Sequence, residues 1–102
     1  MSFHKVALVA DVKENEILAV ATRIGSIALT RIGSEILAFQ NACSHDDNPL
    51  DDGILDGNQV VCPRHGARFD IRTGAVLKMP ATADIEVYPV KISGDDVMVD
   101  FG

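Results

Sequence analysis

The chain contains, at positions 62–70, the stretch Cys62-Pro63-Arg64-His65-Gly66-Ala67-Arg68-Phe69-Asp70. A thiol and an imidazole stand close together in it, around a proline of the kind found in turns. Upstream, Cys43-Ser44-His45 offers the same two side chains, and sixteen residues, 46–61, separate the two pairs. Each pair sits on a short turn, so the two turns can face each other. A metal centre needs thiolate and neutral imidazole ligands that converge in this manner.

Two kinds of metal centre fit the donor set of Cys43, His45, Cys62 and His65. Structural zinc accepts two Cys and two His, but its usual spacing begins with a Cys pair and ends with a His pair. A Rieske [2Fe–2S] cluster takes two Cys on one iron and two His on the other. Because each arm of this chain mixes Cys with His, the spacing favours the cluster and leaves zinc as the alternative.

The neighbouring residues make the resemblance more specific. The 62–70 stretch, followed by Thr73-Gly74, resembles the second cluster-binding loop of Rieske proteins and its hairpin. Pro80-Ala81 resembles the proline-containing loop that covers the cluster from a third side. The resemblance extends from Asn41 to about Ala83 and continues weakly, as an order of strands, to the C-terminus.

The resemblance implies a ligand set and a division of labour. Cys43 and Cys62 would hold the inner, buried iron of one [2Fe–2S] cluster. His45 and His65 would hold the outer iron near the surface, where electrons leave.

The hydrophobic pattern predicts an all-β domain. No stretch of twelve residues carries a convincing helical stripe, and Gly33-Ser34 predicts a tight hairpin turn between two apolar runs. Because Pro89 lies within it, the segment Ile85–Ile92 is predicted to be an edge strand or to contain a bulge. We expect roughly eight to ten short strands. The resemblance implies a small antiparallel β sandwich, with residues 1–102 as one Rieske domain and a cluster-binding subdomain at about 41–76.

Composition and charge exclude several classes of protein. The chain has 102 residues and a net charge of −6, whereas nucleic-acid binders usually carry a basic face. Its longest apolar runs are about five residues, far short of the roughly twenty that span a bilayer. The N-terminus lacks the pattern of a secretion signal. We therefore expect a cytoplasmic protein, in which two cysteines serve a metal better than a disulfide.

Four positions separate this chain from the high-potential Rieske proteins of respiratory complexes. Those proteins add a Cys to each binding loop, whereas Asp47-Asn48 lies near the first such position here and Arg64 occupies the second. They also carry Ser and Tyr hydroxyls that donate hydrogen bonds to the cluster, and Ala67 and Phe69 stand there instead. Fewer donors stabilise the reduced cluster less, so we expect a low reduction potential.

The chain is too short to hold the mononuclear iron domain of an oxygenase. Its one further histidine, His4, is expected at the surface. The chain resembles the small Rieske ferredoxin of aromatic-ring dioxygenases, an electron carrier and not an enzyme. The resemblance implies that it takes single electrons from a flavoprotein NAD(P)H reductase to a terminal oxygenase. A monomer is the default expectation for such a diffusing carrier. Alternatives are a role in iron–sulfur assembly, a small subunit of a nitrite-reductase-like complex, or a zinc-stabilised binding module.

Charged residues near the two motifs have two interpretations each. Arg64 is either a solvated loop residue or a cation that tunes the potential and selects a partner. The acidic residues of the long polar segment either solvate their turns or form an acidic collar that steers the protein toward basic partners; they are Asp46, Asp47, Asp51, Asp52 and Asp56.

Overall fold

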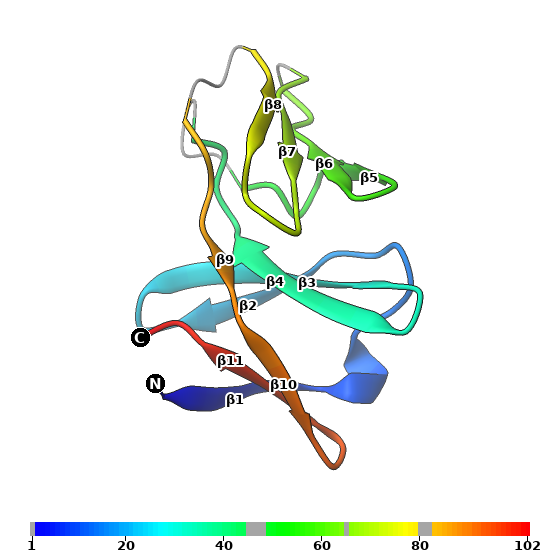
Figure 1. The fold of residues 1–102 in the computed structure, drawn as a ribbon, viewed down its shortest axis with the longest axis vertical. Helices are drawn as coiled ribbons and strands as arrows, with labels where there is room; N and C mark the ends of the chain where they lie inside the picture. The colour runs from blue at the N-terminus through cyan, green and yellow to red at the C-terminus, as the bar shows by residue number, and fades with distance from the viewer. Residues whose placement is uncertain (1, 45–48, 65, 80–82) are drawn as a thin grey trace.

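The computed structural model describes residues 2–44, 49–64, 66–79 and 83–102, and their regular structure is almost entirely β-strand. The strands form three sheets in which every neighbouring pair is antiparallel (Figure 1). The all-β prediction is confirmed. The described residues contain eleven strands, slightly more than expected. No helix in these ranges is long and apolar enough to cross a membrane.

Two of the sheets form a basal sandwich. The three-stranded sheet has the order β1-β11-β10 and the four-stranded sheet the order β2-β3-β4-β9. Their strands are β1 (Phe3–Leu8), β2 (Leu18–Thr22), β3 (Gly25–Ile32), β4 (Glu35–Gln40), β9 (Val87–Tyr88), β10 (Val90–Ser93) and β11 (Asp96–Asp100). A buried cluster joins the two sheets, made of Val12, Ile27, Leu29, Ala38, Val97 and Val99.

The third sheet lies above this sandwich and carries the second motif (Figure 1). Its order is β5-β6-β7-β8, with β5 (Ile54–Asp56), β6 (Gln59–Val61), β7 (Arg68–Asp70) and β8 (Val76–Lys78). Successive side chains of a strand point to opposite faces. In β3, Ile27 and Leu29 therefore enter the basal core, whereas Ala28 joins a second cluster that contains Val60 and Phe69 of the upper sheet. The middle of β3 is buried on both faces for this reason.

Turn residues divide the strands largely as the pattern predicts. Gly33-Ser34 forms the two-residue turn between Ile32 and Glu35, with Gly33 at φ 64°. Pro89 separates β9, which pairs with β4, from β10, which pairs with β11. The predicted segment Ile85–Ile92 is thus two strands in two sheets, because proline cannot donate to either ladder.

A short 3₁₀ turn, η1 (Val9–Asp11), follows β1 and was not expected from the pattern. The half-buried Arg31 holds it, because its guanidinium donates to the carbonyl oxygens of Val12 and Val9, both at 3.0 Å. His4 is also less exposed than expected. Its ring lies 4.7 Å from that of Phe101, and its Nε2 is buried without a hydrogen-bond partner among the described residues.

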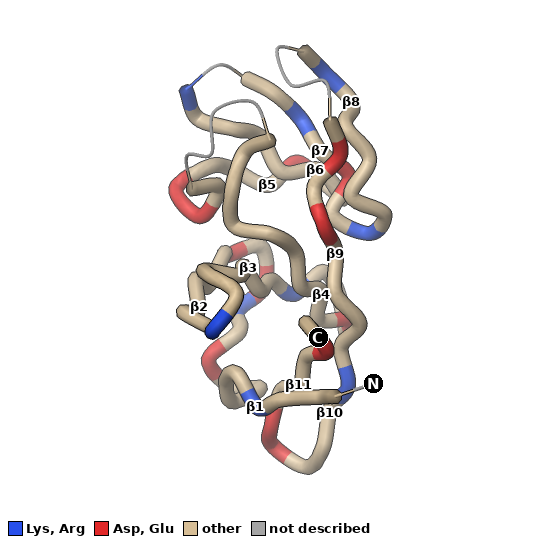
Figure 2. The backbone as a smooth tube through the Cα atoms, turned by 90° about the vertical axis from the view of Figure 1, so that its left-hand side faces the viewer, with Lys and Arg blue, Asp and Glu red and all other residues tan. Residues whose placement is uncertain are grey.

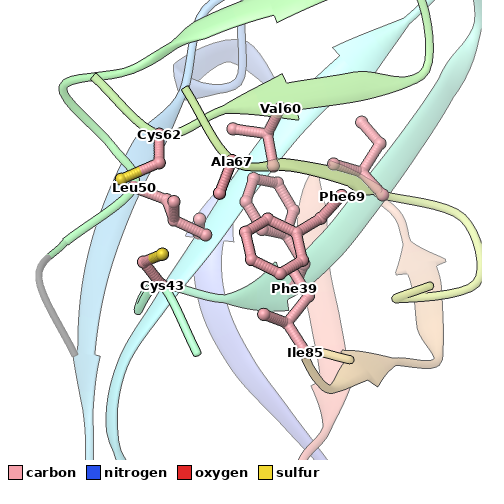
Figure 3. Packing of buried hydrophobic residues seen from close by; sticks show 10 residues of the cluster. Phe39, Cys43, Leu50, Val60, Cys62, Ala67, Phe69 and Ile85 are labelled. Atoms are coloured by element: carbon pink, nitrogen blue, oxygen red, sulfur yellow. The ribbon is translucent and has the colours of Figure 1, made fainter. Parts of the chain in front are cut away.

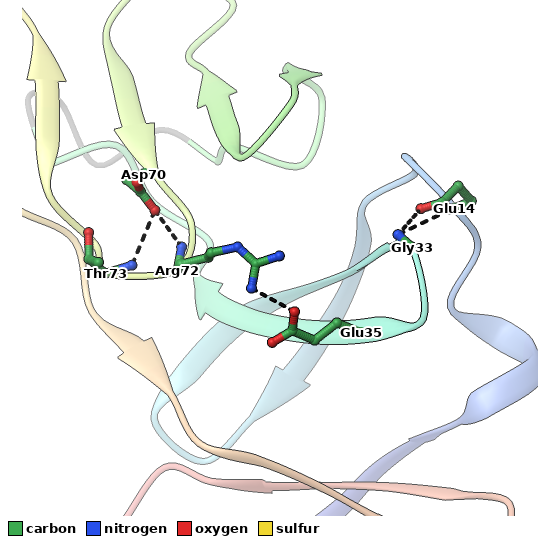
Figure 4. A network of polar contacts seen from close by, with 6 residues as sticks. All are labelled: Glu14, Gly33, Glu35, Asp70, Arg72 and Thr73. Atoms are coloured by element: carbon green, nitrogen blue, oxygen red, sulfur yellow. Dashed lines mark hydrogen bonds and ion pairs between the residues drawn. The ribbon is translucent and has the colours of Figure 1, made fainter.

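Polar contacts fix the upper sheet on the basal one (Figure 4). The carboxylate of Asp70 accepts from the backbone N–H groups of Arg72 and Thr73, at 2.8 and 3.3 Å, and so shapes the β7–β8 turn. From this turn Arg72 reaches Glu35 at the start of β4, with 2.6 Å between Nη1 and Oε1. The ion pair connects the two parts of the fold at the end of β7 away from the second motif.

Candidate metal centre

The second ligand loop is a hairpin connection between β6 and β7. The backbone N–H of Cys62 donates to the carbonyl of Ala67 at 2.8 Å, and the N–H of Gly66 donates to the carbonyl of Cys62 at 3.0 Å. Gly66 has a φ of 74°, in the left-handed region that glycine enters at little cost. Both hydrogen bonds involve Cys62. They fix this residue at the base of the loop, directly after the end of β6.

The first ligand loop leaves the end of β4 and is closed by the side chain of Asn41. The Oδ1 atom of Asn41 accepts from the backbone N–H groups of Leu50 and Asp51, at 2.8 and 2.9 Å. Its Nδ2 donates to Ser26 Oγ at 2.9 Å and to Asp51 Oδ1 at 3.1 Å. Asn41 is only 7% exposed, so this clamp is shielded from water. Sequence reasoning missed the role of Asn41; the available signal was an asparagine, directly after β4, at the start of the long polar segment.

The turn that follows the first loop packs tightly against β6. The N–H of Gly53 donates to the carbonyl of Leu50 at 2.9 Å. A Cβ at Gly53 would collide with the carbonyl oxygen of Val61, the residue directly before Cys62. A glycine in a turn usually supplies a backbone conformation that other residues avoid. What requires glycine here is instead this close approach, which brings the exit of the first loop next to the second cysteine.

Both candidate cysteine ligands are buried in one apolar cluster. Cys43 is 0% and Cys62 1% exposed, and no disulfide joins them. Figure 3 shows their thiols at one end of the cluster with Leu50 beside them, while Phe39 and Phe69 pack against each other nearer its middle. A thiolate is poorly stabilised in apolar surroundings unless a cation accompanies it. Two shielded thiols from two braced loops therefore fit the buried half of an iron–sulfur centre.

The two candidate histidine ligands, His45 and His65, lie outside the described residues. Within the described ranges, no group of three or more Cys, His, Asp or Glu side chains is placed to hold a metal ion. The complete four-residue ligand set thus stays a prediction. The structure describes the neighbours of both histidines, Ser44 on one loop and Arg64 and Gly66 on the other.

A third segment connects the first ligand loop with the β7–β8 hairpin. Ser44 Oγ donates to the carbonyl of Ala83 at 2.5 Å. The following residues bind the β7–β8 region: Asp84 Oδ1 accepts from Val76 N–H at 2.9 Å, and Ile85 N–H donates to the carbonyl of Gly74 at 2.9 Å. Pro80-Ala81, which resembles the covering loop, lies outside the described residues. The described residues that follow it run from the first ligand loop to the β7–β8 hairpin.

The described acidic residues near the loops have partners within the chain. Asp51 accepts from Asn41, Asp52 lies 3.7 Å from Arg64, and Asp56 lies 3.0 Å from Arg68. Figure 2 accordingly shows Lys and Arg interspersed with Asp and Glu on the upper sheet. These contacts weaken the acidic-collar hypothesis for Asp51, Asp52 and Asp56. Asp46 and Asp47 lie outside the described residues.

Comparison with known proteins decides the nature of the centre. The family model of the Rieske [2Fe-2S] domain matches residues 2–89. The chain belongs to the Rieske family. The Rieske match decides between the two metal centres in favour of the iron–sulfur cluster, and the chain carries one [2Fe–2S] cluster of the Rieske type.

Related proteins narrow the branch of the Rieske family. A ferredoxin component of the naphthalene 1,2-dioxygenase system from Pseudomonas aeruginosa is 40% identical over 90 residues, which is 88% of this chain and 86% of the relative. A solved ferredoxin of Sphingomonas yanoikuyae B1 has a TM-score of 0.92 at 34% identity and covers 99% of this chain and 100% of its own. The chain is thus similar, over most of its own length and theirs, to ferredoxins, which are electron-transfer subunits.

A third relative comes from a solved complex of reduced oxygenase and oxidized ferredoxin in carbazole 1,9a-dioxygenase. It is 30% identical, with a TM-score of 0.86, and covers 95% of this Rieske chain and 91% of its own.

Proposed function

We propose that the chain is a soluble, low-potential Rieske ferredoxin that carries single electrons from an NAD(P)H-dependent flavoprotein reductase to a terminal Rieske oxygenase. The observation that carries this proposal is the 40% identity, over most of both chains, to a ferredoxin component of a dioxygenase system. The complex of a related ferredoxin with an oxygenase supports the choice of acceptor. The proposed carrier is a monomer in the cytoplasm, where a nicotinamide-dependent donor has its substrate.

The protein's own residues supply the surroundings of the proposed centre. When bound, the cluster supplies one-electron chemistry. Cys43 and Cys62 would hold it from the buried side, and His45 and His65 would hold it on the outer side. The apolar cluster around the two cysteines keeps water from the buried side. The Asn41 clamp holds the first loop in its closed form. A rigid site of this kind reduces the reorganisation that accompanies electron transfer.

The deciding experiment is reconstitution of electron flow with purified components. The holoprotein should be reddish-brown and, after reduction with dithionite, give the low average g value of a mixed Cys/His cluster in electron paramagnetic resonance. Mixed with a dioxygenase-system reductase, NADH and an oxygenase, it should couple NADH oxidation to product formation. An intact cluster that accepts no electrons from several such reductases would contradict the proposed partners. It would point instead to iron–sulfur assembly or to a nitrite-reductase-like complex.

The proposed low potential has its own test at Ala67. This residue is fully buried in the same cluster of apolar side chains as both cysteines, and it has no hydroxyl that could donate a hydrogen bond. Ala67→Ser should raise the midpoint potential, because a donor near the ligands stabilises the more negative, reduced form. A charge-assisted hydrogen bond contributes about 1.5–3 kcal/mol. The oxidised cluster accepts the bond as well, so only the gain on reduction shifts the midpoint, by less than about 130 mV for one electron.

The measurement is a redox titration followed by electron paramagnetic resonance. Ala75→Ser, in the β7–β8 turn, is the matched control and should leave the midpoint unchanged. A wild-type midpoint well above zero, or a fall in Ala67→Ser, would contradict the proposal.

A further inference from the structure

Arg64 is the one basic side chain in the part of the sequence that carries the two ligand loops. It is the only Lys or Arg between Arg31 and Arg68, a stretch that contains both Cys/His motifs and six acidic residues. It lies two positions after Cys62 and directly before His65. Whatever cationic field the two loops supply to the centre therefore comes from this one side chain.

The guanidinium of Arg64 faces a single described carboxylate across the loops. Its Nη2 lies 3.7 Å from Oδ2 of Asp52, in the turn that follows the first ligand loop. This separation exceeds the 2.7–3.2 Å of an N–H···O hydrogen bond. The two side chains are 39% and 58% exposed. Exposed pairs with such geometry contribute little to the free energy of unfolding, so the pair has little value as a mechanical brace.

The neighbouring ion pair on the same sheet is arranged differently. Arg68 lies 3.0 Å from Asp56 and also donates to Gln59 Oε1 at 3.2 Å. Its guanidinium is held by hydrogen bonds to Asp56, at the end of β5, and to Gln59, at the start of β6. Arg64 has no such second contact among the described residues, and its charge stays at the rim of the ligand loops.

We propose that Arg64 and Asp52 form an opposed charge pair that sets the reduction potential of the centre, with Arg64 favouring and Asp52 disfavouring the reduced state. Reduction adds one electron and so one negative charge to the centre. A nearby cation stabilises this added charge and a nearby anion destabilises it, in proportion to their proximity and to the screening by solvent. The inference rests on the redox role in the proposed function, but it requires only the cluster and neither partner protein.

The test measures midpoint potentials of holoprotein variants by titration at low ionic strength. Arg64→Gln should lower the midpoint, whereas Arg64→Lys, which keeps the charge, should restore most of the wild-type value. Asp52→Asn should raise the midpoint. The double variant Arg64→Gln/Asp52→Asn should lie between the two single variants. All of these shifts should shrink at high salt, because both side chains are exposed.

A matched ion pair serves as the control. Arg72 and Glu35 make a shorter contact, at 2.6 Å, on the β7–β8 turn away from the ligand loops. Arg72→Gln and Glu35→Gln change the net charge of the protein by the same amounts as the test variants. Because this pair lies away from the ligand loops, both variants should leave the midpoint nearly unchanged. The thermal stability of the Arg64 and Asp52 variants should stay close to that of the wild type.

The possible outcomes separate this inference from the proposed function. A colourless protein that takes up no iron would contradict the proposed function itself. An intact cluster whose midpoint moves no more in Arg64→Gln and Asp52→Asn than in the controls would overturn the inference alone. Shifts of the same sign in both variants would also overturn it, because opposite charges must act in opposite directions.

Discussion

Gly53→Ala should lower the apparent melting temperature of the holoprotein by more than about 10 °C. The new Cβ would meet the carbonyl oxygen of Val61, a backbone atom that no side-chain rotation can move away. Overpacking of a well-packed site costs up to about 3 kcal/mol. For a domain of this size, each kcal/mol corresponds to about 4–8 °C. Thermal unfolding followed by circular dichroism provides the measurement.

Gly57→Ala is the control for this prediction. Gly57 lies in the β5–β6 turn with a φ of 61°, and nothing lies within 4 Å of the position of its missing Cβ. The substitution there tests backbone conformation without a collision, at a cost of about 1–2 kcal/mol. Equal or larger destabilisation in Gly57→Ala would show that close approach to β6 is not what requires glycine at position 53.

Asn41→Ala should release the first ligand loop and shorten the lifetime of the cluster. The substitution leaves the buried N–H of Leu50 and the N–H of Asp51 without the oxygen that accepts from both. Each buried group that loses its partner costs about 1–3 kcal/mol. We therefore expect the free energy of unfolding to fall by about 2–4 kcal/mol. The visible absorption of the iron–sulfur cluster should also decay faster when an iron chelator is added.

The exposed Asn58 supplies the comparison for Asn41. Its carbonyl accepts from the N–H of Ile71 at 2.9 Å, a contact that Asn58→Ala retains. This variant should lose its cluster at the wild-type rate. If Asn41→Ala bleached no faster than Asn58→Ala, the first loop would be held by other contacts, such as that between Ser44 and Ala83.

Features that depend on a short stretch of chain were predictable from the sequence. The two Cys/His motifs indicated the Rieske centre before any fold was known, and Gly33-Ser34 placed a tight turn. Pro89 indicated an edge strand or a bulge, but not the boundary between two strands that the structure shows there. Each of these signals is local, because turn chemistry and ligand spacing act over a few residues. The number of strands was slightly underestimated, because a proline that ends one strand can also begin another in a different sheet.

Features that depend on which segments meet in space could not be predicted in the same way. The clamp of Asn41 on Leu50 spans nine positions, and the pair of Arg72 with Glu35 spans 37. Neither contact follows from spacing until the stacking of the upper sheet on β4 is known. The collision at Gly53 was hidden for the same reason. Its role depends on a neighbouring strand and not on its own φ.

The pairing of the first strand with the last offers a route to engineered devices. Phe3 of β1 lies opposite Asp100 of β11, on the basal side of the molecule and away from the β6–β7 connection (Figure 1). A short linker between the two ends would give a circular permutant whose new termini open elsewhere in the basal sandwich. A tag at either end would attach the protein to an electrode with Arg64 and its surroundings facing the solution.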